Sequence, residues 1–378
     1  MKFRPVQNGH NTSNGDSENY GEPIIDPDCN PNKPKTVLFS DISAASVVIK
    51  SAYKEMTPCT RSSKLSPMYG MDLYFKKEYL QETGAFKERG NRFALSKLTE
   101  DELKRGAKEY ALFLSREKNL KYINGYDAVN ILAGQGTVGL EILEQVPDVD
   151  AVLVPVGGGG LLAGVSVAIK TLKPSGVQAK AAPAFTRAHE AGHLVDEKVE
   201  FSLADGLSVT VCGCNSFATA HGLVDKMITV DEDSIALAIL RLIENEKALV
   251  EGAGAVCLAA ILSGQLPELR GKKVVSVLSG GNIDTNVLGK AIERGLAADG
   301  RLIRIEVVVS ERYGGISELT TSITEAGASI KDVNIERAMM ENDVFSVRVR
   351  IMAETRGKEH VKKVQESLKE RYDDVIIS

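Results

Sequence analysis

Three features at the ends of predicted elements could carry chemistry together. Lys87 opens a predicted helix, Gly157–Gly160 follow an apolar strand, and Ser279 follows another apolar strand. A lysine amine can form an imine with an aldehyde, and the backbone N–H groups of a glycine loop can surround a phosphate. A serine hydroxyl can hydrogen-bond a ring nitrogen. Together they suit a ligand that combines an aldehyde, a ring nitrogen and a phosphate, which is the chemistry of pyridoxal 5′-phosphate.

The glycine run is longer than a tight turn requires. Glycines let the backbone close around an anion, and the N-terminus of the helix beginning at Leu161 adds favourable polarity. A dinucleotide loop is the main alternative, because Gly158, Gly160 and Gly164 form a loose G-x-G-x-x-x-G pattern. That loop needs an acidic residue about 20 residues later, and the segment there, Val-Gln-Ala-Lys, has none. We therefore predict a phosphate loop.

Two other patterns resemble metal motifs. His189-Glu190-Ala191-Gly192-His193 matches the H-E-x-x-H pattern of zinc proteases, which needs both histidines on one face of a stable helix. Gly192 interrupts that segment, and no third ligand is apparent. Cys212 and Cys214 lie close together but have no second pair of ligands. The sequence therefore predicts no metal site.

Composition sets outer limits on the function. The chain has 378 residues, 43% hydrophobic and 26% charged, which is typical of a globular protein with two or three domains. The formal net charge is -5 and no basic stripe appears, so a nucleic-acid partner is not expected. The apolar runs fall short of the ~20 residues of a membrane span. Five cysteines are too few for a disulfide scaffold, so we expect a cytoplasmic location.

The chain divides into a tail and three regions, at about residues 37–121, 122–300 and 301–378. Residues 1–36 are rich in Asn, Pro, Asp, Gly and Ser, and are predicted to be a disordered tail. In the first structured region we predict a strand at residues 73–77, a helix from Lys87 and a further helix opened by a capping box, Thr99 and Glu102. Strands at residues 152–156, 227–230 and 274–278 then alternate with helices at 161–172, 231–246 and 284–296. Such alternation predicts an α/β fold with a parallel sheet whose apolar strands are buried on both faces.

The pattern changes after residue 300. Strands are predicted at residues 303–309, 329–337, 344–352 and 375–377, and helices at 315–326 and 358–371. The order β-α-β-β-α-β is the ferredoxin-like arrangement. A domain of this size appended to an enzyme usually senses a ligand or mediates oligomerisation.

With these motifs in place, the sequence resembles the L-threonine/L-serine dehydratases, pyridoxal-phosphate enzymes of fold type II that are related to tryptophan synthase β chains and serine racemase. The resemblance covers residues 38–300 and rests on six segments in order: Thr83–Gly90, Ala133–Thr137, Gly157–Gly160, Ala204–Leu207, Glu251–Ala255 and Ser279–Asn282. The last domain resembles an ACT domain, the amino-acid-sensing module of many dehydratases. The resemblance thus implies a tryptophan synthase β-like catalytic domain over residues 37–300 and an ACT regulatory domain over residues 301–378.

The resemblance also implies roles. Lys87 would be the catalytic residue that forms the imine, and the cofactor-binding residues would be Phe86, Lys87, Gly157, Gly158, Gly159, Gly160, Leu161 and Ser279. The glycines with Leu161 would hold the phosphate, Phe86 would line the ring, and Ser279 would meet the pyridine nitrogen. The implied reaction removes the substrate α-proton and β-hydroxyl, giving ammonia plus 2-oxobutanoate from L-threonine or pyruvate from L-serine.

The sequence departs from the family at two places in the catalytic domain. Relatives carry a Ser-x-Gly-Asn-His loop that grips the substrate carboxylate, and here the chain passes from Lys104-Arg105-Gly106-Ala107 directly into a helix that comes much later in relatives. Roughly two βαβ units of ~30 residues are missing, which leaves the small domain incomplete. A shorter loss is expected near residues 176–178, where relatives have a cation-binding glutamate. A misplaced substrate can cost ~100-fold in rate, so we expect weak or no turnover.

Two alternatives stay open beside the dehydratase. Serine racemase shares the motifs, and a non-catalytic regulatory or decoy subunit of the full-length enzyme would explain the missing loop. In every case we expect a homo-oligomer built through the ACT domain, an amino-acid effector at that domain, and a role in amino-acid catabolism. Serine and threonine differ by one methyl group, worth only ~1–3 kcal/mol in discrimination, so the sequence does not rank them.

Overall fold

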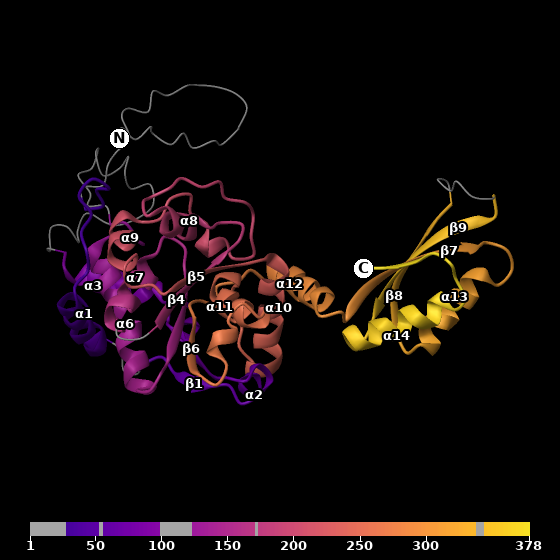
Figure 1. Ribbon diagram of the computed structural model, residues 1–378, viewed down its shortest axis with the longest axis horizontal. Helices are drawn as coiled ribbons and strands as arrows, with labels where there is room; N and C mark the ends of the chain where they lie inside the picture. Colours follow the sequence, from indigo (N-terminus) through magenta and orange to yellow (C-terminus); the bar gives the residue numbers. More distant parts are fainter. Residues whose placement is uncertain (1–27, 53–55, 99–122, 171–172, 338–343) are drawn as a thin grey trace, which may run out of the picture.

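A large α/β body and a smaller C-terminal domain form the two ends of the molecule. The computed structural model describes residues 28–52, 56–98, 123–170, 173–337 and 344–378. Helix α12 (Thr285–Ala298) leads from the first body into the second (Figure 1). Among the described residues, no helix combines the length and the apolar character needed to cross a membrane.

The large body is built on a six-stranded sheet of order β1-β2-β6-β3-β4-β5. β1 pairs antiparallel with β2, and the other neighbouring strands are parallel. Because β2 and β6 are parallel and in register, the segments that follow them leave the sheet at the same edge. The strands are β1 (Cys59–Arg61), β2 (Asp72–Lys77), β3 (Ala151–Pro155), β4 (Lys173–Ala179), β5 (Lys226–Val230) and β6 (Lys273–Leu278).

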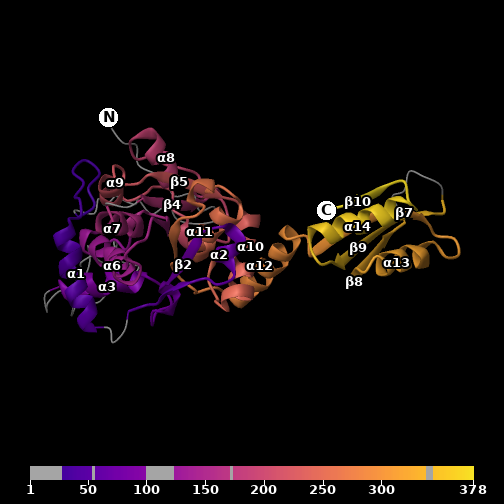
Figure 2. The same cartoon turned by 60° about the horizontal axis from the view of Figure 1, so that its bottom comes forward.

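Both faces of this sheet are covered by hydrophobic side chains, as the apolar strands predict. Val152 and Val154 of β3 belong to one buried cluster, whereas Leu153 between them belongs to another on the opposite face. Helices lie on both sides of the sheet (Figure 2), and the helices of each side contribute side chains to the cluster on that side. The first side holds α1 (Phe39–Ala52), α3 (Lys87–Ser96), α6 (Val129–Gln145), α7 (Gly160–Ala168), α8 (Ala184–Ala191) and α9 (Cys214–Ala220). The second side holds α2 (Leu65–Tyr69), α10 (Glu232–Arg241), α11 (Gly252–Leu262) and part of α12.

Short helical turns complete the body. Three are single 3₁₀ turns, and a π-helix, η3, continues α10 directly, so the helix predicted over residues 231–246 is present with a changed hydrogen-bond pattern at its end. These turns are η1 (Glu78–Leu80), η2 (Asp205–Leu207), η3 (Leu242–Glu246) and η4 (Pro267–Leu269).

The C-terminal domain has the predicted β-α-β-β-α-β order. Its antiparallel sheet has the order β10-β7-β9-β8, and α13 and α14 pack on one side of it around a separate buried cluster. The elements are β7 (Leu302–Ser310), α13 (Gly315–Glu325), β8 (Ser329–Glu336), β9 (Ser346–Glu354), α14 (Lys358–Lys369) and β10 (Val375–Ile377). This strand order is the ferredoxin-like arrangement predicted from the sequence.

Some boundaries differ from the predictions. The helix expected over residues 161–172 ends at Ala168, because β4 begins at Lys173 and pairs with both β3 and β5. Part of the predicted tail is ordered, since the Lys35 backbone N–H donates to Asn215 Oδ1 at 2.6 Å and Asn215 Nδ2 donates to the Asp28 carbonyl. Residues 1–27 and the predicted helix after Thr99 lie outside the described residues.

The described residues of the large body contain a single sheet. A second, smaller sheet is not found among them. β4 runs through the position of the expected shorter loss as a regular strand. Its Gln178 is buried and accepts hydrogen bonds from the Thr186 N–H and hydroxyl, both at 2.7 Å.

Candidate functional site

Lys87 is held at the first turn of α3 by a backbone connection to the end of β6. Ala85 forms an isolated antiparallel bridge with Gly280, and the Phe86 N–H donates to the Ser279 carbonyl at 2.9 Å. The Gly281 N–H donates back to the Gly84 carbonyl at 3.0 Å. These bonds bring the segment before α3 against the turn after β6, so Lys87 and Ser279 face the same space.

Two features favour a glycine at position 84. Gly84 has a φ of +74°, which favours glycine, and an added Cβ would lie 2.3 Å from Asn282 Oδ1. Asn282 Nδ2 in turn donates to the Thr83 carbonyl at 2.9 Å. The glycine in the predicted lysine segment therefore permits the close approach that joins it to the Ser279 turn.

The predicted phosphate loop lies between β3 and α7. Gly159 has a φ of +97°, and a Cβ there would lie 2.6 Å from Cε2 of Phe185. A Cβ at Gly158 would lie 2.2 Å from Cδ2 of Tyr126, and a Cβ at Gly160 would lie 2.6 Å from the Tyr126 carbonyl oxygen. Side chains would thus fill the cradle, and the start of α7 directs backbone N–H groups toward it, as anion binding requires.

A buried clasp behind the glycine loop was not predicted. The Gly213 N–H donates to the Gly158 carbonyl at 2.9 Å, and the Ser216 hydroxyl donates to the Tyr126 carbonyl at 2.8 Å. Asp127 accepts from the Ser216 N–H at 2.8 Å and from the Cys214 thiol at 3.3 Å. Burial and the Asp127 charge raise the pKa of Cys214 to about 12, so its thiol stays protonated and structural.

A buried ionic cluster anchors α3 from beneath. Arg89, two residues after Lys87, donates to both Glu78 oxygens and both Glu141 oxygens at 2.6–2.8 Å. Lys76 donates to Glu141 at 2.6 Å. Burial would raise the pKa of Glu78, but Arg89 and Lys76 outweigh it and hold that pKa at about 2. The cluster therefore fixes the start of α3 through charge as well as packing.

All eight residues predicted for the site line one cavity. Phe86, Lys87, Gly157–Gly160, Leu161 and Ser279 surround it, and Ser279 is buried. Sequence reasoning missed other lining residues with polar or close backbone contacts: Tyr126, Gln135, Gly206, Leu207 and Glu251. Gln135, Gly206, Leu207 and Glu251 fall within segments that carried the resemblance, but a motif alone gave them no role.

The cavity fits pyridoxal 5′-phosphate on its own chemistry. It combines an amine, a glycine cradle that side chains would fill and a buried hydroxyl. Within the described part of the chain, the buried Gln135 Oε1 has no hydrogen-bond partner, which leaves a polar atom for a bound molecule. These groups match the anion, aldehyde and ring nitrogen of that cofactor.

Two histidines of the H-E-x-x-H pattern are separated by the end of a helix. α8 ends at Ala191, and Gly192 adopts a left-handed φ of +73°, so His193 lies outside the helix that carries His189. His189 instead packs edge-on against His221, with ring centroids 4.9 Å apart. Among the described residues, no group of three or more potential ligands is placed to hold a metal ion.

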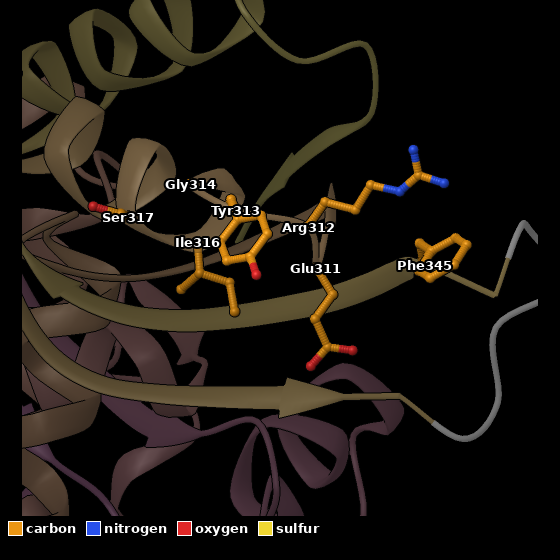
Figure 3. A pocket seen from close by; sticks show the side chains of 7 residues that line it. All are labelled: Glu311, Arg312, Tyr313, Gly314, Ile316, Ser317 and Phe345. Carbon is orange, nitrogen blue, oxygen red and sulfur yellow. The ribbon is translucent and has the colours of Figure 1, made fainter.

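A second hollow lies in the C-terminal domain, where β7 leads into α13. It has a volume of about 490 Å³ and is lined by Glu311, Arg312, Tyr313, Gly314, Ile316, Ser317 and Phe345 (Figure 3). The Arg312 guanidinium lies over the Phe345 ring at 4.3 Å, and Glu311 pairs with Arg337 at 2.5 Å. Both a cation and a carboxylate therefore border this hollow.

Comparisons with known sequences identify a family. The model of the pyridoxal-phosphate dependent enzymes matches residues 101–280. The L-threonine ammonia-lyase of Geobacter sulfurreducens is 42% identical over 67% of this chain, which spans 64% of that relative's length. The L-threonine ammonia-lyase of Thermotoga maritima is 33% identical over 88% of this chain and 97% of its own length. That alignment covers 392 positions, more than the 378 residues of this chain, so the relative has residues without a counterpart here.

Solved structures show the same fold for the large body. The processed form of threonine deaminase isoform 2 from Solanum lycopersicum superposes with a TM-score of 0.63 and 27% identity, covering 72% of this chain and 98% of that chain. Serine racemase from Dictyostelium discoideum superposes with a TM-score of 0.60 and 29% identity, covering 66% of this chain and 99% of that chain. The fold is therefore the tryptophan synthase β-like fold of pyridoxal-phosphate enzymes, as predicted.

Proposed function

We infer an activity from the family, since the chain belongs to the pyridoxal-phosphate dependent enzymes and, within them, to the threonine ammonia-lyases. We propose that it catalyses α,β-elimination from L-threonine or L-serine in amino-acid catabolism. The substrate loses its α-proton and β-hydroxyl as water, and the resulting enamine is hydrolysed to ammonia and a 2-oxo acid. L-threonine gives 2-oxobutanoate and L-serine gives pyruvate.

The residues that line the cavity divide this task. When bound, pyridoxal 5′-phosphate supplies an aldehyde for amines and a ring that withdraws electrons from the substrate α-carbon. Lys87 is proposed to hold the cofactor covalently between turnovers and, once its amine is free, to accept the α-proton as a base. Gly157–Gly160 and Leu161 would bind the phosphate through backbone N–H groups, and Phe86 would line the ring.

Ser279 is proposed to set how strongly the cofactor ring withdraws electrons from the substrate. A neutral hydroxyl beside the ring nitrogen leaves that nitrogen largely unprotonated, so the ring withdraws electrons less strongly. A weaker electron sink suits elimination of a β-hydroxyl better than transamination. The burial of Ser279 supports this role, because bulk water cannot replace its hydroxyl at the nitrogen.

The convergence of Lys87, the glycine loop and Ser279 on one cavity is the single observation that carries the proposal. The test is to incubate the full chain with pyridoxal 5′-phosphate, reduce with borohydride and map the modified peptide by mass spectrometry. Modification at Lys87, absent in Lys87→Ala and retained in the neighbouring Lys77→Ala control, is expected. A folded chain that stays unmodified would overturn the proposal.

We propose that turnover is weak, because the sequence lacks the Ser-x-Gly-Asn-His loop that the family resemblance assigns to gripping the substrate carboxylate. The turnover rate is measured as the release of 2-oxo acid from L-threonine and L-serine, monitored with a coupled dehydrogenase assay. A rate equal to that of full-length relatives would contradict the proposal. Modification of Lys87 without any turnover would instead favour the non-catalytic subunit, which mixing with a full-length relative and assaying its activity would examine.

Serine racemase is the second candidate, because a serine racemase is among the solved structures with this fold. Racemisation and elimination both begin with removal of the α-proton. Racemisation results when a proton returns before the hydroxyl leaves, and elimination results when the hydroxyl leaves first. Chiral chromatography of serine recovered after incubation separates them. D-serine in excess of released pyruvate would favour the racemase.

We propose that the C-terminal domain is an ACT-type sensor for an amino acid and an oligomerisation module. The hollow at the start of α13 supports the first role, since Arg312 and Glu311 could pair with a carboxylate and an ammonium group. We further propose a reducing, cytoplasmic location, in keeping with all five cysteines being free. Light scattering of the full chain tests the expected homo-oligomer.

A further inference from the structure

Gln135 lines the same cavity as Lys87 and Gly157–Gly160, but the activity proposed above does not use it. The residue belongs to α6 and is only 1% exposed. Its amide oxygen, Oε1, is buried, and no donor within the described part of the chain reaches it. A buried acceptor without a donor costs free energy in the folded protein, and such groups are rare in native structures. An unused acceptor in a binding cavity therefore points to a donor that arrives with the ligand.

Two close contacts between glycines fix the backbone that carries Gln135. An added Cβ at Gly134 would lie 2.6 Å from Gly90 Cα in α3. On the other side, an added Cβ at Gly164 in α7 would lie 2.6 Å from the Gly136 backbone nitrogen. Because these glycines have no side chains, α6 packs directly against the backbones of both neighbouring helices. The N-terminal ends of α3 and α7 line the cavity, so Gln135 is held beside both helices that form the site.

The Gln135 amide lies against the face of α3 that carries Lys87. An added Cβ at Gly90 would lie 2.7 Å from Gln135 Nε2 and 3.0 Å from Gln135 Cδ, so the amide occupies the space that a side chain at position 90 would need. Lys87 and Gly90 are three residues apart, and residues at that spacing share one face of a helix. The Gln135 amide and the Lys87 side chain therefore belong to one corner of the cavity.

The chemistry of the ligand limits which group can donate to Gln135. Lys87 does not donate to Oε1 in the structure, and Lys87 is proposed to be bonded to the cofactor between turnovers. A carboxylate has only acceptor oxygens, and the phosphate is assigned to the backbone N–H groups of Gly157–Gly160. The substrate amine is taken up by its bond to the aldehyde. The donors that remain are hydroxyl groups, one on the cofactor ring and one on the β-carbon of L-serine or L-threonine.

We propose that Gln135 is a ligand-binding residue whose Oε1 accepts a hydrogen bond from a hydroxyl group of the bound cofactor or substrate. The inference rests on the proposed function, because that function brings these hydroxyl groups into the cavity. The amide stays neutral and transfers no proton, so Gln135 orients the hydroxyl and adds to binding. A ligand without that hydroxyl leaves Oε1 buried and unpaired, and a site that hydrogen-bonds a hydroxyl discriminates against the analogue that lacks it.

The experiment compares the full chain with Gln135→Met, which keeps a flexible side chain and removes the amide acceptor. In the first arm, equilibrium dialysis measures the affinity for pyridoxal 5′-phosphate and for its 3-deoxy analogue, which lacks the ring hydroxyl. In the second arm, absorbance of the cofactor-loaded chain after rapid mixing measures the affinity for L-threonine and for L-2-aminobutanoate, which lacks the β-hydroxyl. The parent should prefer the hydroxyl ligand by about 2- to 10-fold in one arm, and Gln135→Met should lose that preference.

Gln178→Met is the matched control. Gln178 is fully buried but lies outside the cavity, and its Oε1 accepts from the Thr186 N–H and hydroxyl, both at 2.7 Å. Gln178→Met should keep the hydroxyl preference of the parent. In urea unfolding without cofactor it should lose more stability than Gln135→Met, because it leaves two donors unpaired, whereas Gln135 Oε1 accepts from no described donor. A merely structural Gln135 would show a comparable loss of stability and no change in preference.

The outcomes separate this inference from the function on which it rests. If pyridoxal 5′-phosphate and borohydride do not modify Lys87 in the parent chain, the proposed function fails. If the parent is modified, loss of the preference in Gln135→Met supports the inference, and the arm in which it is lost identifies the hydroxyl as that of the cofactor or of the substrate. A preference that is absent in the parent, or equal in both proteins in both arms, overturns the inference and leaves Oε1 to an ordered water. Should Gln135→Met not fold, Gln135→Leu removes the same acceptor and is read in the same way.

Discussion

The backbone N–H of Phe86 donates to the carbonyl of Ser279 at 2.9 Å, and this bond joins the two segments that carry the site. Lys87 follows the donor, and the Ser279 hydroxyl belongs to the acceptor residue. The position of the amine and that of the hydroxyl are therefore set by one short antiparallel contact between the start of α3 and the end of β6. Variants that disturb this contact should affect both groups together.

Gly159→Ala should weaken cofactor binding and destabilise the fold. The left-handed φ of +97° and a Cβ at 2.6 Å from Phe185 both oppose a side chain there, at a cost of about 1–3 kcal/mol. Because the loop is proposed to hold the phosphate, affinity for pyridoxal 5′-phosphate should fall more than affinity for pyridoxal. Spectroscopic titration with both compounds measures this.

Gly192→Ala is the matched control for that glycine. Its φ of +73° imposes similar backbone strain, but an added Cβ has nothing within 4 Å. Urea unfolding should show a modest loss of stability of about 1 kcal/mol, with cofactor affinity unchanged. Equal losses of cofactor affinity in both variants would contradict the role of the glycine loop.

Ser279→Ala should weaken cofactor binding without unfolding the protein. The ring nitrogen would lose its polar partner in a buried position, which costs about 1–3 kcal/mol, or roughly 5- to 150-fold in affinity. Equilibrium dialysis against pyridoxal 5′-phosphate measures the change. Ser276→Ala, on the strand β6 that precedes Ser279, is the comparison, because the buried Ser276 Oγ has no partner in the described structure, and its loss should leave affinity unaltered.

Glu78→Gln should destabilise the protein by about 3–5 kcal/mol at neutral pH, because it leaves buried Arg89 incompletely paired. Glu82→Gln, whose ion pair with Arg92 is exposed, should cost at most about 1 kcal/mol. Urea unfolding of the three proteins gives these differences. A loss in Glu78→Gln no larger than in Glu82→Gln would show that the buried cluster contributes little.

The same carboxyl predicts a pH dependence. The pKa of Glu78 lies near 2 in the folded chain and at 4.5 as its ordinary value, so its ionised form stabilises the fold above pH 4.5. This contribution is lost as pH falls from 4.5 through about 2. The stability difference between the parent and Glu78→Gln should therefore narrow over that window, and a constant difference would argue against the depressed pKa.

An amino-acid effector should stabilise the C-terminal domain, and Arg312→Ala should abolish the effect. A thermal-shift screen of the common amino acids on the full chain tests this, since a ligand bound to the folded state alone raises the melting temperature. Lys331→Ala, whose side chain is not among those lining the hollow, is the control. Retention of the full shift by Arg312→Ala would place the effector elsewhere.

The sequence was sufficient for the parts of the fold that repeat a simple pattern. Apolar strands such as Val152–Val154 predicted a sheet buried on both faces, and the change of pattern after residue 300 predicted the ferredoxin-like domain. Lys87, Gly157–Gly160 and Ser279 were predictable because each follows or begins an element at a place where glycine or a reactive side chain is unusual. The structure brings them to one cavity.

The residues that sequence reasoning missed act through contacts between distant segments. Glu251, which precedes α11, and Gln135 of α6 both reach the cavity, and neither side chain stands out in its own stretch of sequence. The clasp of Asp127, Cys214 and Ser216 depends on the meeting of a loop with α9, for which local pattern provides no sign. Contacts between residues far apart in the sequence leave no periodic pattern, so the sequence pattern did not predict these residues.

The joint between the two bodies is short and bound by charge. Arg241, at the end of α10, pairs with Asp299 at 2.5 Å, and Glu244, in η3, pairs with Arg301 at 2.6 Å, where α12 passes into β7. Ion pairs therefore hold the C-terminal domain to the large body at this junction, and the two are not joined by a flexible linker. A rotation of the C-terminal domain relative to the large body would strain the contacts between α10 and α12. A conformational change in the C-terminal domain could therefore be transmitted to the large body through this pair of helices.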